Sequence, residues 1–255
     1  MNRISQYIFS TVLGLVVFFF WIILHPYDLS FQEQNQLFLF TWDYFLERIS
    51  VCGGLADYIA EFITQFNYIP YLGEALMALL FVIFQIVTAA SICRKEWYVL
   101  SFITPVMMLV YMNDIYVMLC YLIALIIAAS MCALYRRYPG VLWACIATVL
   151  GYWLIGPAIF VFTLFAVLRE RNWNSLILVA VAVLTLVVSK WTYLQQYPWK
   201  TLAFGVNYYR HALVVPPMQL VIAAAAVLVP AFSDLLPKPK TYVNFALGLL
   251  IAATG

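Results

Sequence analysis

The amino-acid sequence predicts an all-α, polytopic membrane protein, and its composition and hydropathy pattern carry that prediction. Of the 255 residues, 66% are apolar and 9% are charged, against roughly 45–50% and roughly 25% in ordinary soluble domains. The apolar residues occur in repeated continuous runs of helix length. In lipid, such runs must satisfy their own backbone polar groups as helices, and they lack the alternation of barrel strands.

About nine hydrophobic segments follow one another in what we expect to be a single transmembrane domain, 1–255. They are 7–24, 71–92, 97–112, 115–134, 141–154, 157–168, 176–189, 218–232 and 241–255. The first is followed by "HPYDLS" and not by a small-residue cleavage site, which predicts a retained signal anchor. The last ends inside an apolar run without a flanking charge. We therefore expect the chain to be the N-terminal part of a longer protein.

The positions of the cations predict the orientation of the segments. If the N-terminus is cytoplasmic, most of the 13 Lys and Arg residues also face the cytoplasm, as the positive-inside rule requires. The cytoplasmic set is Arg3, Arg94, Lys95, Arg136, Arg137, Arg169, Arg171, Lys238 and Lys240. Two loops then lie on the outer side, 26–70 and 190–217, together with most of the acidic residues.

Segments 141–154 and 157–168 are predicted to form a short helical hairpin that turns at Gly156-Pro157. At about 1.5 Å per residue, each is shorter than the roughly 30 Å hydrocarbon core. Segment 97–112 is also short and turns at "NDIY". Because irregular backbone at membrane depth must be buried or line water, we expect a cleft open to the outer side there. The alternative is one long kinked helix through Gly156-Pro157.

Two amphipathic helices are predicted in the first outer loop, one in 35–50 and one in 53–68, separated by Gly53-Gly54 and closed by Pro70. Each has an apolar face and an Asp-x-x-x-Glu pair on the other face. The apolar faces carry Phe38, Trp42, Phe45, Leu46 and Ile49 in the first helix and Leu55, Ile59, Phe62, Ile63 and Phe66 in the second. The acidic pairs are Asp43 with Glu47 and Asp57 with Glu61.

These acidic faces differ from those of helices that only lie on lipid, whose polar faces usually carry Lys and Arg. We expect them to point at water, a metal, a cationic group or the mouth of the cleft. Simple solvation is the plain alternative. Carboxylates could also hold a divalent cation or act as a general base. The candidate catalytic residues are Asp28, Glu33 and Asp43, with Asp57 and Glu61 as candidate substrate-binding residues.

Asp114 lies at the tip of the "NDIY" turn and is a candidate buried acid, with helix capping as the alternative. The second outer loop combines Lys200, Arg210 and His211 with six Trp and Tyr residues. Those aromatics suit a membrane belt. The basic groups between aromatic walls would also suit a ligand that carries a phosphate or a sugar.

Several function classes find no support in the sequence. The net charge of +2 gives no bulk argument for nucleic acid. No HExxH, P-loop, GxSxG or dinucleotide fingerprint occurs, and two histidines are too few for a His-rich zinc site. The five cysteines form no CxxC pair and are expected to be structural thiols. A divalent cation at the carboxylates is the one cofactor that the residues suggest, and its identity stays open.

Three stretches, "NQLFLFTWDYF", "GGLADYIAEFITQFNYIPYLG" and "GYWLIGPAIFVF", together resemble an uncharacterised family of bacterial multi-span membrane proteins. That resemblance implies the bacterial inner membrane but no activity. A looser, architectural likeness is to the lipid-linked glycosyltransferases of the C-type membrane fold. It implies a polyprenyl-phosphate lipid substrate, an essential acid soon after the first span, matched by position by Asp28 or Glu33, and basic residues at the lipid phosphate. The paired acidic signature of those enzymes is not clearly present.

Three hypotheses for function therefore stand side by side. The first is an outward-facing transferase in which Asp28, Glu33 or Asp43 acts as base or metal ligand and Arg210 and His211 anchor a phosphate. A transporter or flippase, with Asp114 or Glu74 binding the coupling cation, is the second, although no internal duplication is evident. The third is a non-catalytic anchor or assembly subunit whose outer loop docks a partner.

Overall fold

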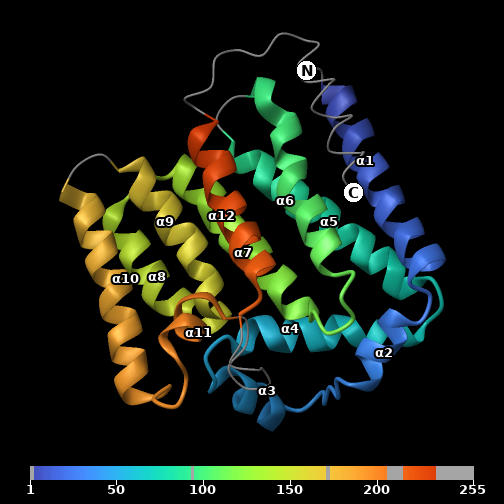
Figure 1. The fold of residues 1–255 in the computed structure, drawn as a ribbon, viewed down its shortest axis with the longest axis horizontal. Coiled ribbons are helices and arrows are strands. Elements are labelled where there is room, and N and C mark those ends of the chain that lie inside the picture. Colours follow the sequence, from blue (N-terminus) through green and yellow to red (C-terminus); the bar gives the residue numbers. More distant parts are fainter. Residues whose placement is uncertain (1–2, 93–94, 171–172, 206–214, 234–255) are drawn as a thin grey trace.

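The computed structural model describes residues 3–92, 95–170, 173–205 and 215–233, and every regular element in these ranges is a helix (Figure 1). The helices are α1 (Arg3–Phe19), α2 (Asp28–Gln34), α3 (Trp42–Ile49), α4 (Gly54–Thr64), α5 (Leu72–Ser91), α6 (Ile103–Tyr111), α7 (Leu119–Arg137), α8 (Val141–Ile155), α9 (Ile159–Arg169), α10 (Trp173–Thr192), α11 (Trp199–Phe204) and α12 (Pro217–Phe232). Short π or 3-10 segments follow α1 and α4, precede α6 and join α8 to α9. The predicted all-α class is confirmed for the described residues.

Five stretches within the described residues are long and apolar enough to cross a membrane, as in an integral membrane protein. By length and composition alone they are Ile4–Leu24, Leu72–Ser91, Leu119–Arg137, Val141–Arg169 and Trp173–Thr192, of which Val141–Arg169 comprises two helices, α8 and α9, and the turn between them. The shorter apolar helices are Glu96–Tyr111 and Pro217–Phe232. The predicted count of about nine is not confirmed, because two predicted segments share the stretch Val141–Arg169 and segment 241–255 lies outside the described residues.

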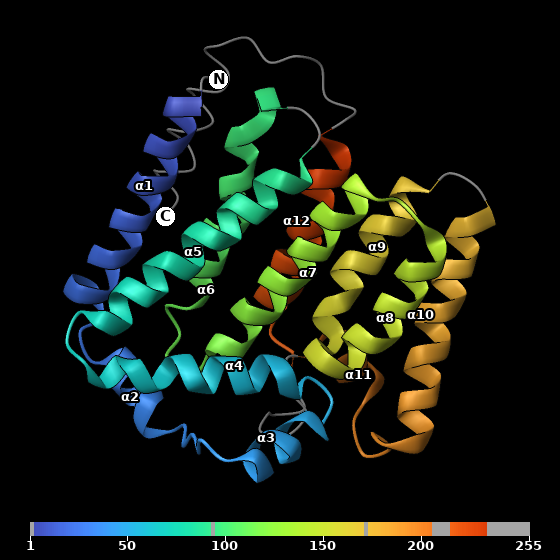
Figure 2. The same ribbon diagram turned by 180° about the vertical axis from the view of Figure 1, so that it is seen from behind.

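The long helices run up and down beside one another, and α7 lies at the centre (Figures 1 and 2). Helix α1 packs on α5, α5 on α7, α7 on α9, and α9 on both α10 and α12. Helix α7 buries eleven of its residues, whereas α10 buries only Leu178. Helix α10 is therefore a peripheral span. Its exposed Val and Leu side chains need no protein cover where lipid tails surround them.

The helical hairpin predicted at Gly156-Pro157 is confirmed. The Oγ1 atoms of Thr148 on α8 and Thr163 on α9 lie 2.9 Å apart. On one continuous helix these residues would be about 22 Å apart at about 1.5 Å per residue. Gly156 has a φ of 70°, which suits glycine, and it begins the short 3-10 turn Gly156–Ala158. The alternative of a single kinked helix is therefore wrong.

The loop 26–70 departs from its predicted helices. Residues 36–41 are not helical, and α3 begins after Thr41, whose hydroxyl accepts a hydrogen bond from the Tyr44 amide at 3.3 Å. Helix α2 was not predicted. The break at Gly53-Gly54 is confirmed, because Gly53 has a left-handed φ of 83° and α4 starts at Gly54.

Helix α4 crosses the end of the bundle and packs against α7 and α8, as Figure 2 shows. Helix α8 has 15 residues and spans only about 22 Å, which leaves room beneath the α8–α9 turn. Part of the space in which we expected an open cleft is thus occupied by α4. This arrangement places α4 and the charges it carries against the end of the helical bundle.

Candidate functional site

The acidic side of α4 faces the protein interior. Asp57 is 5% exposed and Glu61 is 1% exposed, whereas Phe62 on the predicted apolar face is 38% exposed. Of the four targets expected for this acidic face, water is therefore excluded for Asp57 and Glu61. The small residues Ala56 and Ala60 share the buried side, and their size lets α4 approach the bundle closely. Polar groups turned inward are the usual arrangement for a helix that has lipid or apolar cover on its other side.

The opposite side of α4 is covered in part by aromatic residues of the loop that precedes it. The ring of Phe38 lies 5.0 Å from that of Tyr58 and 5.5 Å from that of Phe62, measured between ring centroids. The Phe45 ring of α3 lies 5.0 Å from Tyr58. Helix α4 is thus sandwiched between the bundle and an aromatic layer.

A buried ion pair joins α3 to α4. Arg48 Nε donates to Glu61 Oε2 at 3.0 Å, and Arg48 is 6% exposed. The Tyr44 hydroxyl lies 2.5 Å from the same Glu61 oxygen, and Arg48 Nη2 donates to that hydroxyl at 2.8 Å. Of the targets predicted for the acidic faces, a cationic group is confirmed for Glu61, and the cation comes from the same loop.

The protonation states in this cluster follow from burial and contacts. Burial raises the pKa of the Tyr44 phenol, and its hydrogen bond to Glu61 raises it further. Burial lowers the pKa of Arg48, but the contacts with Tyr44 and Glu61 outweigh burial and leave that pKa raised. Tyr44 is therefore a neutral donor and Arg48 a cation throughout the physiological pH range.

The corner between α3 and α4 is fastened to the tip of the α8–α9 hairpin. The Gly53 amide donates to the Trp153 carbonyl at 2.7 Å, and the Cys52 thiol donates to the Tyr152 carbonyl at 3.0 Å. Trp153 Nε1 donates to the Ile49 carbonyl at 2.9 Å. The first two bonds satisfy carbonyls near the C-terminal end of α8, and the third satisfies a carbonyl at the C-terminal end of α3. Burial raises the pKa of Cys52, which is an inert structural thiol as expected.

Asp28 begins α2, and its Oδ2 lies 2.6 Å from His25 Nδ1. Their side chains are 22% and 18% exposed, so water reaches both of them. The His25 ring also contacts Phe20, with ring centroids 4.8 Å apart. The imidazole is thus held by a carboxylate on one nitrogen, which is how a general base is commonly oriented.

The other predicted acids are not gathered around Asp28. Glu33 is half-buried on α2, and Asp43 is exposed in the first turn of α3. Asp114 is exposed, and its Oδ1 accepts a hydrogen bond from the Tyr116 amide at 3.0 Å. The prediction of Asp114 as a buried acid is therefore wrong. Its hydrogen bond stabilises the turn between α6 and α7. The helix-cap alternative is wrong as well, because Met112 is the C-cap of α6 and Met118 is the N-cap of α7.

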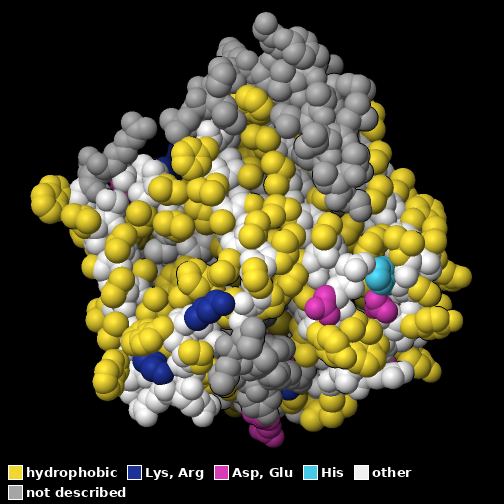
Figure 3. Space-filling view, viewed as in Figure 1, with side chains coloured by type: hydrophobic (Ala, Val, Ile, Leu, Met, Phe, Trp, Pro, Cys, Tyr) yellow, Lys and Arg dark blue, Asp and Glu magenta, His cyan; other side chains and the backbone are white. Residues whose placement is uncertain are grey.

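Lys200 is the described member of the predicted basic group, and it is exposed on α11. Arg210 and His211 lie outside the described residues. Within the described part of the chain, no three His, Cys, Asp or Glu side chains come together in a way that could hold a metal ion. Figure 3 shows a largely hydrophobic face on which most visible charged side chains lie toward the end formed by α2, α3 and α11.

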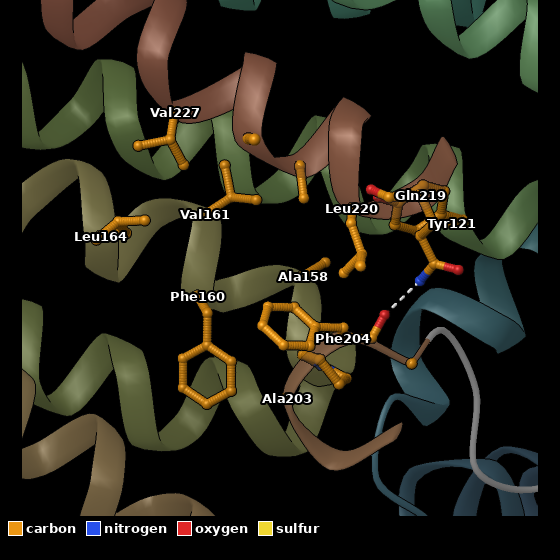
Figure 4. Close-up of a pocket in the computed structure, with 14 residues that line it drawn as sticks. Tyr121, Ala158, Phe160, Val161, Leu164, Ala203, Phe204, Gln219, Leu220 and Val227 are labelled. Atoms are coloured by element: carbon orange, nitrogen blue, oxygen red, sulfur yellow. Dashed lines mark hydrogen bonds between the residues drawn. The ribbon is translucent and has the colours of Figure 1, made fainter. Parts of the chain in front are cut away.

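An apolar groove of about 290 Å³ lies between α9, α11 and α12. Phe160, Val161 and Leu164 approach it from α9, Phe204 from α11, and Leu220 and Val227 from α12 (Figure 4). Gln219 lies at one end, where its amide donates to the Phe204 carbonyl at 2.5 Å. From Gln219 to Val227 the groove follows α12 for about 12 Å. Its walls therefore match a hydrocarbon chain.

Comparison with known proteins assigns the chain to one family. A family model described as "Family of unknown function (DUF6057)" matches residues 2–250. The chain belongs to the DUF6057 family. No curated protein and no solved structure matches it.

In this DUF6057 member, the contacts of three side chains were not predicted from the sequence: those of Arg48, Tyr44 and His25. Arg48 is the only cation in 26–70, and a lone cation among carboxylates was a signal for an internal ion pair. Tyr44 precedes it by four residues, the spacing that places two side chains on one helix face. His25 precedes Asp28 by three residues, but its pairing depends on the turn at Pro26, which no periodicity predicts.

Proposed function

We propose that this DUF6057 protein binds a membrane lipid in the groove between α9, α11 and α12 and acts on that lipid at the end of the bundle formed by α2, α3, α4 and α11. The observation that carries the proposal is the apolar groove itself. Leu164 and Phe204 line it and are 49% and 48% exposed. The groove is thus continuous with the outer surface of the helices, where a lipid chain can enter from the bilayer.

The cations on and after α11 favour a lipid that carries a phosphate. Helix α11, which forms one wall, carries the exposed cation Lys200. The sequence places Arg210 and His211 shortly after α11, and we retain them as proposed phosphate anchors. A polyprenyl-phosphate-type lipid combines the chain and the head group that these features would recognise. The cation distribution and the bacterial resemblance further support an inner-membrane location with a cytoplasmic N-terminus and a periplasmic groove end.

The lipid is best identified on the purified protein. We expect the detergent-solubilised wild type to retain a lipid detectable by native mass spectrometry. Ala224→Trp should lose it, because Ala224 lines the groove and an indole would fill it. Val221→Trp is the matched control, since Val221 lies on the same helix, is 50% exposed and does not line the groove. Equal lipid content in both variants would contradict the proposal.

A second candidate function, a lipid-linked transferase, is favoured by the His25–Asp28 pair. A transferase needs an oriented base for the acceptor hydroxyl, and this pair supplies one with partial access to water. Here Asp28 orients His25, while Glu33 and Asp43 remain proposed acids. No three possible ligand side chains come together among the described residues, so a divalent cation would need further ligands from the substrate. The transporter and anchor hypotheses have no comparable observation in their favour.

The two candidate functions, lipid binding and lipid-linked transfer, predict different effects of Asp28→Asn on the cellular lipids. For a transferase, we expect lipid extracts of cells expressing the wild type to contain a modified lipid that is missing with Asp28→Asn, at equal protein levels. Glu47→Gln is the comparison, because Glu47 is an exposed acid for which no catalytic role is proposed. If Asp28→Asn leaves the lipid extract unchanged, the transferase candidate is excluded while lipid binding in the groove still stands.

A further inference from the structure

A second apolar surface lies at the same end of the molecule and is separate from the groove. We call it the α3 apolar surface. It consists of Leu37, Leu39, Phe40, Trp42 and Leu46, which are 70%, 46%, 84%, 69% and 46% exposed. Single exposed apolar residues are ordinary, but five within ten residues form a patch that requires a partner.

The exposed part of α3 has two edges. Tyr44 and Arg48 occupy its buried side, where they bind Glu61. On the remaining side, Trp42 and Leu46 lie four residues apart and form an apolar edge, while Asp43 and Glu47 form an acidic edge beside it. A helix with this division suits a boundary between lipid and water, with its apolar edge in the lipid.

The position of α3 relative to the spans agrees with that boundary. Helix α10 has 20 residues and is about 30 Å long, which equals the thickness of the hydrocarbon core. Just beyond its end, the Tyr193 ring lies 5.3 Å from the ring of Trp153, whose Nε1 donates to the carbonyl of Ile49 at the end of α3. Figures 1 and 2 both show α3 level with this end of α10.

We infer that the α3 apolar surface is inserted into the interfacial layer of the same bilayer that the long helices cross, so that the first loop is a membrane-embedded cap and not a free extramembrane loop. The partner is the lipid surface. The acidic edge, with Asp43 and Glu47, faces the aqueous side and disfavours anionic head groups. This inference does not depend on lipid binding in the groove.

Spin labels on single cysteines test this placement. The full chain, with its five native cysteines replaced by serine, is reconstituted into phosphatidylcholine vesicles after labelling at Phe40→Cys or Leu46→Cys. The matched control is Glu47→Cys, on the acidic edge of α3. Power-saturation electron paramagnetic resonance compares collisions with oxygen, which concentrates in lipid, and with a water-soluble nickel chelate.

We expect at least a threefold higher ratio of oxygen to nickel accessibility at residues 40 and 46 than at residue 47. A ratio at both sites equal to that at residue 47 would show that water covers the surface and would overturn the inference. Shielding of both sites from both reagents would show that a second copy covers it, which overturns the inference as well. The side chains of Phe40, Leu46 and Glu47 are all exposed. Because two independent sites are labelled, one poorly folded variant does not decide the result.

Discussion

Removal of the Arg48 cation should destabilise the protein strongly. Arg48→Met keeps most of the side-chain volume but leaves the Glu61 carboxylate, which is 1% exposed, without the guanidinium that lies 3.0 Å from it. Breaking one partner of a buried ion pair costs about 3–5 kcal/mol, because the remaining charge stays buried. At about 2–4 °C per kcal/mol for a chain of this size, the thermal midpoint should fall by about 6–20 °C.

The assay is thermal unfolding of the detergent-solubilised protein, followed by fluorescence-detected size exclusion after heating. Glu47→Gln on the same helix is the control, and it should stay within about 0.5 kcal/mol of the wild type because Glu47 is exposed. The double variant Arg48→Met/Glu61→Leu should be more stable than the sum of the two single effects, since it removes both charges together. A midpoint for Arg48→Met within about 2 °C of the wild type would refute the reasoning.

Three further predictions concern the hairpin, the corner and the phenol. Thr148→Cys/Thr163→Cys should form a disulfide on mild oxidation, seen as a mobility shift reversed by reductant, because their hydroxyls are 2.9 Å apart; a continuous helix would form none. Gly54→Ala should unfold at least about 3 kcal/mol more easily in a denaturation assay, since its new Cβ would lie 1.7 Å from the Arg48 carbonyl oxygen; wild-type stability would contradict this. Because the folded pKa of Tyr44 is raised above 10.0, its contribution to stability is present below pH 10 and lost as pH rises through the folded pKa. Tyr44→Phe should therefore show a shallower loss of stability above pH 10 than the wild type in unfolding titrations, and an equal slope would count against the buried phenol.

The span regions and the hairpin were predictable because their physical causes are local. Segments of 14 and 12 residues are too short to cross the core, and Gly156-Pro157 supplies a turn between them, so the fold-back follows from length and turn chemistry. The break at Gly53-Gly54 was predictable for the same reason. Helix α2 and the non-helical stretch 36–41 were not, because their conformation depends on contacts such as that of Gln32 with the Val117 carbonyl, 85 residues away.

The candidate site was only partly predictable. Periodicity correctly places Asp57 and Glu61 on one side of α4, but periodicity does not say which side faces the protein. Water was one of four expected targets of this acidic side and is excluded by burial, whereas a cationic group, also expected, is the observed partner of Glu61. The prediction for Asp114 is wrong in the opposite sense: it was expected to be buried, but the turn between α6 and α7 leaves it exposed.

The sequence by itself determined that this chain is helical and apolar enough to enter a membrane, because hydrophobic run length and the lack of charge act on each segment separately. It also determined the two-faced character of α3 and α4. Only the tertiary structure decided which face is buried, since Arg48 and Glu61 lie thirteen residues apart and meet only when α3 folds back on α4. The groove likewise exists only after α9, α11 and α12 pack, because no one of these helices encloses a space alone.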